Sequence, residues 1–252
     1  MESYATAQQV YVAGLIFSRL SSLVMLMPGI GDTTVPPRIR LAFAFVMSLM
    51  LMPVVAPHLP PVPNAVGGMV TGILKEVLIG LMIGSILRIF LMSLATAGEI
   101  ISIQTTLSFA QTAAPGVAPG SSTVSTFLGL IGLVLIMVTD LHHLFLAAIV
   151  KSYTLFPFTR DLPVTDSATL AVQTVAGCFK LGVQLSAPVL VFSLVFNIAT
   201  GLVGRVMPQF QVFFVASPLM VLFGLSIMAL SLGVIGTVWM SRYRDLLMIF
   251  GG

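Results

Sequence analysis

Charged side chains stand inside long apolar stretches of this 252-residue chain, where they are the first candidates for chemistry. Lys75 and Glu76 are neighbours in one such stretch. Adjacent residues on a helix point about 100° apart, so these two side chains pair poorly with each other. They could line an ion or proton path. Charges inside membranes are usually partnered, which favours the alternative of interhelical salt bridges or the start of an interfacial helix.

Asp140 and His143 offer a second possibility for chemistry. Their spacing of three residues places both on one face of a helix, where Asp-x-x-His could bind a metal or relay a proton. A zinc site needs three or four ligands, and the histidine outside this stretch, His58, lies in a distant proline-rich segment. The shortage of ligands favours a polar contact at a helix end, and we predict neither a metal nor another cofactor.

Nucleophilic and nucleotide chemistry find little support in the sequence. Ser121 and Ser122 follow a glycine, but no G-x-S-x-G elbow surrounds them. The chain also lacks a P-loop and a G-x-G-x-x-G motif. Its single cysteine, Cys178, is typical of a small packing residue. We therefore predict that the protein is not an enzyme.

Composition identifies the kind of element that must position these residues. Hydrophobic residues make up 58% of the chain and charged residues 8%, and the mean hydropathy is +1.10. A soluble domain carries roughly 25% charged residues, so this chain cannot cover itself with a water-compatible surface. The fold class that follows is an all-α polytopic membrane protein. The net charge is +3 without a Lys/Arg run, which gives no support for nucleic-acid binding.

We expect about six apolar helical segments within a single domain, residues 1–252. The second segment has about fifteen residues, whereas a bilayer span needs about twenty. Lysines and arginines fall on both predicted sides of the membrane, so the positive-inside signal is weak. The expected segments are residues 10–27, 41–55, 68–97, 127–150, 168–203 and 212–240.

Charges recur within these segments, and this pattern indicates protein neighbours. Each charge costs about 2.5–3.5 kcal/mol at the centre of a membrane helix unless it is paired or faces protein. Such a chain fits better in a hetero-oligomer than in lipid alone. Gly80 and Gly84 form a G-x-x-x-G pair, which permits helices to approach closely. The charges are Arg19, Lys75, Glu76, Arg88, Asp140 and Lys180.

A long neutral segment, residues 98–126, separates two apolar runs. It is rich in proline, glycine and serine and carries one charge, Glu99. It is too polar for a lipid-facing helix and less charged than most solvent loops. We expect it to fold back into a protein-lined space such as a pore mouth or a plug.

Three ordered blocks of sequence resemble the FliR family of flagellar export-gate proteins, and the resemblance covers nearly the whole chain. Asn197, Arg205, Pro208 and Gln209 stand in register with the family pattern. The chain departs from that pattern where Thr106, Ala114 and Leu141 replace Gly, Asp and Gly. The blocks are GEIISIQTTLSFAQTAAPG, DLHHLFLAAIVKSYTLFP and APVLVFSLVFNIATGLVGRVMPQFQVFFVASPLMVLFG.

The resemblance implies a non-enzymatic core subunit of the flagellar type III protein export gate. It implies a place in the bacterial inner membrane at the flagellar basal body. Residues 1–158 would form a FliP-like part, and residues 159–252 a FliQ-like helical hairpin and tail. The implied partners are FliP-like and FliQ-like subunits in a hetero-oligomer, FlhB-like and FlhA-like export components, membrane lipid, and the unfolded flagellar subunits in transit.

The resemblance also gives the neutral segment a role as a plug across the closed pore. Phe109 is large enough to block, and prolines and glycines let the backbone fold and move. The predicted plug residues are Phe109, Gln111, Pro115, Gly116, Pro119 and Gly120. The predicted polar and packing residues between helices are Lys75, Glu76, Gly80, Gly84, Asp140, His143, Asn197, Arg205, Pro208 and Gln209.

Two alternatives remain open from the sequence. One is a small membrane transporter or channel that acts alone, in which Lys75, Glu76, Glu99 and Asp140 line the substrate path. No convincing internal repeat of the kind found in transporters supports it. The other is the equivalent subunit of a virulence type III secretion system.

Overall fold

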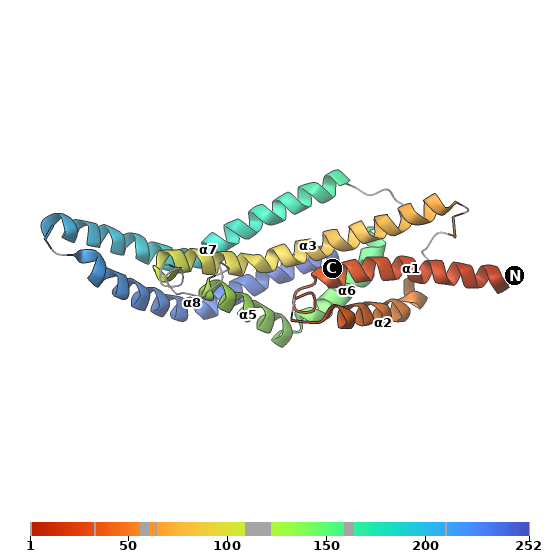
Figure 1. Cartoon of the computed structure of the whole chain (residues 1–252), viewed down its shortest axis with the longest axis horizontal. Helices are drawn as coiled ribbons and strands as arrows, with labels where there is room; N and C mark the ends of the chain where they lie inside the picture. Colours follow the sequence, from red (N-terminus) through yellow and green to blue (C-terminus); the bar gives the residue numbers. More distant parts are fainter. Residues whose placement is uncertain are drawn as a thin grey trace. The chain divides into compact units, whose positions relative to one another are not determined.

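The structure is a computed structural model that describes residues 2–32, 34–55, 61–63, 65–108, 122–158, 164–209 and 211–251. Within these ranges the chain is helical and contains no strand. Five helices are long and apolar enough to cross a membrane, or up to six if α5 and α6 form one interrupted span. The predicted all-α polytopic fold is confirmed. The helices are α1 (Glu2–Leu26), α2 (Pro37–Val55), α3 (Val66–Gln104), α5 (Thr123–Val138), α6 (Leu141–Leu155), α7 (Val164–Val206) and α8 (Val212–Gly251) (Figure 1).

The second apolar segment is longer than the sequence suggested. Helix α2 begins at Pro37, and proline fits the first turn of a helix because its missing N–H has no intrahelical partner there. The 19 residues of α2 are enough for a membrane span. The expectation of a short second segment was therefore wrong.

The helices on either side of the neutral segment extend into it. Residues 98–104 continue α3, and α5 begins at Thr123. The side chains of Ile101 and Ser102 are fully buried, so packing holds this part helical despite its polar composition. The expectation that the irregular segment starts at residue 98 was wrong for that reason.

The fourth apolar segment is two helices instead of one. Helix α5 ends at Val138, and Asp140 has φ 56° and ψ 19°, in the left-handed region. A residue in this conformation cannot continue a right-handed helix, although aspartate tolerates it better than most residues. The chain therefore turns at Asp140 and starts again as α6.

Three helices are much longer than a membrane span. Helices α3, α7 and α8 contain 39, 43 and 40 residues. At about 1.5 Å per residue, each runs for about 60 Å along its axis. The hydrocarbon core of a bilayer is about 30 Å thick. These helices therefore reach about twice the distance that lipid tails can cover.

The chain divides into two compact units. Unit 1 contains Met1–Phe90, Thr139–Val175 and Arg244–Gly252, and unit 2 contains Leu91–Val138 and Ala176–Tyr243. Helices α3, α7 and α8 contribute to both units. The division of the chain at residue 158 into FliP-like and FliQ-like parts rests on resemblance and stays a prediction.

Unit 1 is built around α1, whose apolar side chains are buried along most of its length. Ile16 and Leu20 are fully enclosed. Helix α2 packs on α1 through an edge-to-face contact between Phe17 and Phe45, with ring centroids 6.0 Å apart. Much of α2 remains exposed and apolar, including Val46 and Met50.

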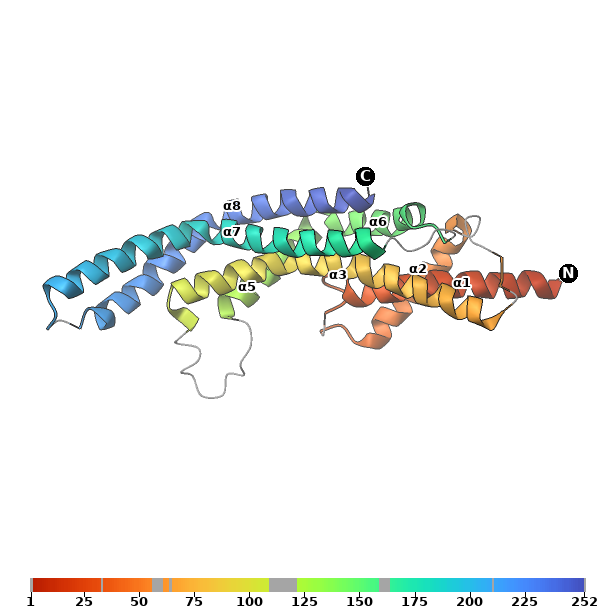
Figure 2. The ribbon, with the colours of Figure 1, turned by 90° about the horizontal axis from the view of Figure 1, so that it is seen from above.

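Unit 2 is built around the buried Trp239 of α8. Its indole stacks on Tyr243 at a centroid distance of 4.9 Å, and its Nε1–H donates to Ser93 Oγ of α3 at 3.1 Å. Figures 1 and 2 show the C-terminal part of α7 and the N-terminal part of α8 side by side. Phe192 and Phe223 meet between them at 6.0 Å.

Candidate functional site

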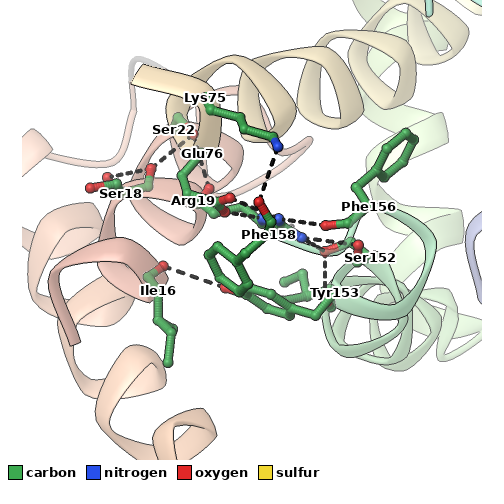
Figure 3. A network of polar contacts seen from close by, with 12 residues as sticks. Ile16, Ser18, Arg19, Ser22, Lys75, Glu76, Ser152, Tyr153, Phe156 and Phe158 are labelled. Carbon is green, nitrogen blue, oxygen red and sulfur yellow. Dashed lines mark hydrogen bonds and ion pairs between the residues drawn. The ribbon is translucent and has the colours of Figure 1, made fainter. Parts of the chain in front are cut away.

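A buried arginine lies at the centre of a polar network in unit 1 (Figure 3). Arg19 projects from α1 and is 1% exposed. Its Nε donates to Glu76 Oε2 at 2.5 Å, and its Nη2 donates to Glu76 Oε1 at 3.1 Å. This two-point geometry is the strongest form of an arginine–carboxylate pair. It joins α1 to α3 and makes Glu76 an interhelical salt-bridge partner.

The other guanidinium donors reach the end of α6. Nη1 donates to the carbonyl oxygen and the hydroxyl of Ser152 at 2.9 and 3.3 Å, and Nη2 also donates to the Phe156 carbonyl at 2.9 Å. All five N–H groups of Arg19 thus have an acceptor. The guanidinium carbon also lies 4.2 Å from the Tyr153 ring centroid and 5.1 Å from that of Phe158. Such contacts stabilise a desolvated cation.

Lys75 and Glu76 serve different partners, as their adjacent positions on a helix require. Glu76 faces Arg19, whereas Lys75 Nζ donates to the Phe158 carbonyl at 3.1 Å. Two cations therefore meet carbonyl oxygens at and beyond the C-terminal end of α6, where the helix dipole is negative. The network holds α1, α3 and α6 together and presents no nucleophile.

The two glycines of the G-x-x-x-G pair lie where α3 touches α1. A Cβ on Gly80 would collide with Ser22 Oγ and the Arg19 carbonyl oxygen. A Cβ on Gly84 would lie 2.9 Å from Leu26 Cβ. These glycines follow Glu76 by one and two turns, so the close approach of the helices brings Glu76 within reach of Arg19.

Asp140 and His143 come together at the start of α6, and His142 joins them. Asp140 Oδ1 lies 3.7 Å from His143 Nδ1 and 3.9 Å from His142 Nε2. The donor atoms of the three residues all lie within 4.8 Å of one another. Residues two apart on a helix face nearly opposite directions, so the helical spacing that pairs Asp140 with His143 gives no reason to expect His142 beside them. The left-handed backbone of Asp140 removes that restriction.

The residues near the end of α7 are not gathered into one site. Asn197 lines an open pocket of about 260 Å³ between α7 and α8, together with Thr106 and Ser217. Arg205 is exposed in the last turn of α7, where a cation suits the helix dipole. Pro208 and Gln209 are exposed in the turn that follows.

The predicted plug residues Phe109, Gln111, Pro115, Gly116, Pro119 and Gly120 lie outside the described residues. The helix that follows them is firmly capped. Glu99 Oε1 accepts the Ser122 backbone N–H at 2.7 Å, and Ser122 Oγ accepts the Ser125 N–H at 3.1 Å. Ser122 thus acts as the N-cap of α5. A Cβ on Gly98 would collide with the Ser125 backbone, so α3 and α5 touch at this point.

The end of α3, before the predicted plug residues, is held against α7 and α8. Ser193 Oγ of α7 donates to Gln104 Oε1 at 2.8 Å. Thr105 fills the notch at Gly224 of α8, where a Cβ would collide with the threonine methyl group. The hydroxyls of Thr106 and Ser217 lie 3.3 Å apart. The described residues on both sides of positions 109–121 are therefore anchored within unit 2.

Known proteins resemble this sequence over nearly its whole length. Residues 10–246 match the model of a family described as bacterial export proteins, family 1. The flagellar biosynthetic protein FliR of Caulobacter vibrioides is 64% identical over 250 residues, which cover 99% of this chain and 100% of that protein. The chain belongs to the FliR family.

More distant FliR proteins match over most of their length. The FliR protein of Aquifex aeolicus is 28% identical over 94% of this chain and 91% of its own length. The FliR protein of Escherichia coli is 27% identical over 84% of this chain and 80% of its own length. Membership of the FliR family makes this chain a component of the flagellar export apparatus. Its apolar helices make it a membrane protein.

One departure from the FliR pattern acquires a physical meaning in the structure. Thr106 stands where the resemblance to the family leads us to expect glycine, and its φ is 60°. Helices commonly end on a glycine in this left-handed conformation. A β-branched side chain is unusual there. A glycine would therefore suit the turn that closes α3, and this chain accommodates threonine there.

Proposed function

We propose that this chain is a non-enzymatic core subunit of the flagellar type III export gate. It would assemble with FliP-like and FliQ-like subunits in the inner membrane at the flagellar basal body, beside FlhB-like and FlhA-like components. Unfolded flagellar subunits would pass through the channel that these chains enclose. The observation that carries the proposal is the length of exposed apolar surface on α7.

Exposed apolar side chains follow α7 from Val172 to Val206. These residues span about 50 Å of helix at 1.5 Å per residue. Even a helix tilted by 40° crosses the hydrocarbon core in about 40 Å. Of the most apolar window in α7, 11% is buried within the chain. Protein surfaces of other subunits would cover the part of α7 that lipid cannot.

The described polar groups support a structural role over an enzymatic one. Arg19 and Glu76 engage each other with every guanidinium donor satisfied. Ser122, which follows a glycine–serine pair in the sequence, uses its hydroxyl to cap α5. Neither arrangement provides a nucleophile with an adjacent base. The relatives are likewise named as flagellar biosynthetic proteins.

The α7–α8 hairpin, in this proposal, is the FliQ-like part that begins at residue 159. The preceding residues, to 158, would pack beside FliP-like subunits. Within those preceding residues, the segment that includes Phe109 and Gly120 would close the resting channel. Its support is the anchoring of its neighbours: Glu99 to Ser122 on one side and Gln104 to Ser193 on the other. A closure element needs fixed ends if its middle is to return to one position.

Co-expression tests the assembly. The chain should accumulate in membranes and co-purify when it is produced with FliP-like and FliQ-like neighbours, and should be degraded when produced alone. A monodisperse, stable chain that transports a solute without partners would contradict the proposal and favour a transporter that acts alone.

Deletion of residues 113–121 tests the plug. Ion conductance through the assembled gate should rise, because the deletion removes the part of the segment that folds across the pore. Replacement of the same residues by a Gly-Ser segment of equal length is the control. It tests whether the size of the side chains or only the length of the segment keeps the conductance low. An assembled deletion variant without increased conductance would refute the plug while leaving the subunit role intact.

A further inference from the structure

We propose that Asp140, His142 and His143 form a binding site for a divalent transition-metal ion. The cluster lies in unit 1 at the start of α6, whereas the Arg19 network contacts the other end of that helix. The inference does not depend on the proposed gate function, because it concerns the ligand chemistry of three side chains in this chain alone.

The distances fit a site that closes around an ion. Asp140 Oδ1 lies 3.7 Å from His143 Nδ1 and 3.9 Å from His142 Nε2. Around a tetrahedral zinc ion with bonds of about 2.0–2.2 Å, the ligand atoms lie about 3.3–3.6 Å apart. Asp140 Oδ1 therefore needs to come less than about 1 Å closer to each imidazole nitrogen, and the two nitrogens, within 4.8 Å of each other, need to approach by about 1.5 Å or less. Rotation of exposed side chains supplies such a movement.

The chemistry of the donors selects the class of ion. Two imidazoles and one carboxylate on one side of an ion are a ligand set of zinc and of other late first-row metals, with further positions left open. Calcium and magnesium prefer oxygen ligands, of which this cluster supplies one residue. Water or a group from a neighbouring subunit can complete the coordination.

His142 offers its Nε2, and not its Nδ1, to the cluster. Its Nδ1 is buried and has no hydrogen-bond partner in the described part of the chain. Its Nε2 is the nitrogen that faces Asp140. Side-chain exposure is 32% for His142, 68% for His143 and 74% for Asp140, so an ion can reach the cluster from outside.

The backbone makes this combination of three residues possible. Asp140 is left-handed and precedes the first residue of α6, so its carboxylate reaches residues two and three positions further along. The same carboxylate offsets the positive end of the α6 dipole, which would otherwise repel a cation. The turn at Asp140 thus both interrupts the helix and completes the ligand set.

Zinc binding by the purified complex tests the site. The full-length chain, co-purified with its neighbours through a tag without histidine, is dialysed against Zn²⁺, and bound zinc is counted by atomic absorption. We expect one more zinc ion per chain in the wild type than in Asp140→Asn, His142→Gln or His143→Gln. Loss of a residue that only hydrogen-bonds to a metal ligand lowers metal affinity at least about tenfold, so loss of a direct ligand should lower zinc affinity by at least that factor. His58→Gln is the matched control and should retain the ion.

Cobalt spectroscopy provides a second readout that does not depend on the variants. Co²⁺ bound to nitrogen and oxygen ligands should give visible absorption bands in the wild-type complex, which added Zn²⁺ removes.

Asp140→Asn keeps a residue type that tolerates a left-handed backbone, so the fold is preserved while the anionic ligand is lost. Absence of the bands in the wild type, equal zinc content in the wild type and all three variants, or loss of zinc in His58→Gln would overturn the proposal.

Discussion

The two units hold their helices together by different means. In unit 1, one buried guanidinium joins α1, α3 and the end of α6 through Glu76, Ser152 and Phe156. In unit 2, hydroxyl, amide and indole groups make separate contacts, such as Trp239 with Ser93 and Ser193 with Gln104. Glycine notches accompany both arrangements.

This difference predicts two kinds of response to mutation. A buried ion pair is costly to desolvate, and removal of one partner leaves an uncompensated charge, which costs about 3–5 kcal/mol. Neutral hydrogen bonds between membrane helices contribute about 0.6 kcal/mol on average, and rarely more than about 1.7 kcal/mol. A single substitution in the network of unit 1 should therefore cause a large loss of stability, whereas single substitutions in unit 2 should each cause a small loss.

Removal of Arg19 should have the largest effect. Arg19→Met leaves Glu76 buried without a partner, so the assembly should lose about 3–5 kcal/mol of stability. The double variant Arg19→Met/Glu76→Leu should be less damaging than the sum of the two single changes. The fraction of chain that remains in the detergent-solubilised complex after heating measures both. Arg242→Met, at an exposed position, is the control and should change stability by less than about 0.5 kcal/mol. Additive effects would contradict the idea of a single cooperative network.

A methyl group at the α1–α3 contact should have the next largest effect. Gly80→Ala places a Cβ against Ser22 and the Arg19 carbonyl, which should cost about 1–3 kcal/mol in the same thermal assay. Gly14→Ala in α1 is the matched control, because no atom lies within 4 Å of its Cβ position. That change should be neutral or stabilising by up to about 1 kcal/mol. Equal effects at the two glycines would show that helix propensity, and not close approach, decides the outcome.

Loss of one neutral contact in unit 2 should have a smaller effect. Ser93→Ala removes the acceptor of the buried Trp239 indole N–H, so a loss of about 1 kcal/mol is expected in thermal unfolding of the complex. Ser226→Ala is the control, since that exposed hydroxyl bonds within its own helix, to the Leu222 carbonyl. A loss for Ser93→Ala as large as that for Arg19→Met would erase the contrast between the units.

A glycine at position 106 should stabilise the chain slightly. Thr106→Gly relieves a left-handed backbone that is unfavourable for a β-branched residue. The gain should be about 0.5–1 kcal/mol, since it is offset by greater backbone freedom and by loss of the contact with Ser217. Ser217→Ala measures the hydrogen-bond part alone. A destabilised Thr106→Gly variant would show that the hydroxyl contact outweighs the backbone strain.

The sequence predicts the class of the fold because composition and segment length depend on chemistry that every residue carries. It also indicates that Glu76 needs a partner, since a carboxylate in an apolar helix is costly alone. It could not name Arg19 as that partner. The two residues are 57 positions apart, and their meeting depends on how Gly80 lets the helices approach.

Local conformation explains what the sequence missed. Helical spacing predicts that Asp140 meets His143 and not His142, but Asp140 is not helical. Residues 98–104 look irregular by composition, yet burial of Ile101 and Ser102 keeps them in α3. In both places a tertiary contact or a single backbone angle overrides the pattern of residue types, and neither is visible from spacing alone.

The exposed apolar length of α7 has a consequence for the life of the protein in the cell. A chain whose surface is completed by other subunits has a folding equilibrium that includes the concentration of those subunits. In the proposed gate, the lifetime of this chain would be set by the ratio in which the gate proteins are synthesised. Surplus copies would have no stable resting state and would become substrates for membrane proteases. Mass action would thereby match the number of these chains to the number of gates without a dedicated regulator.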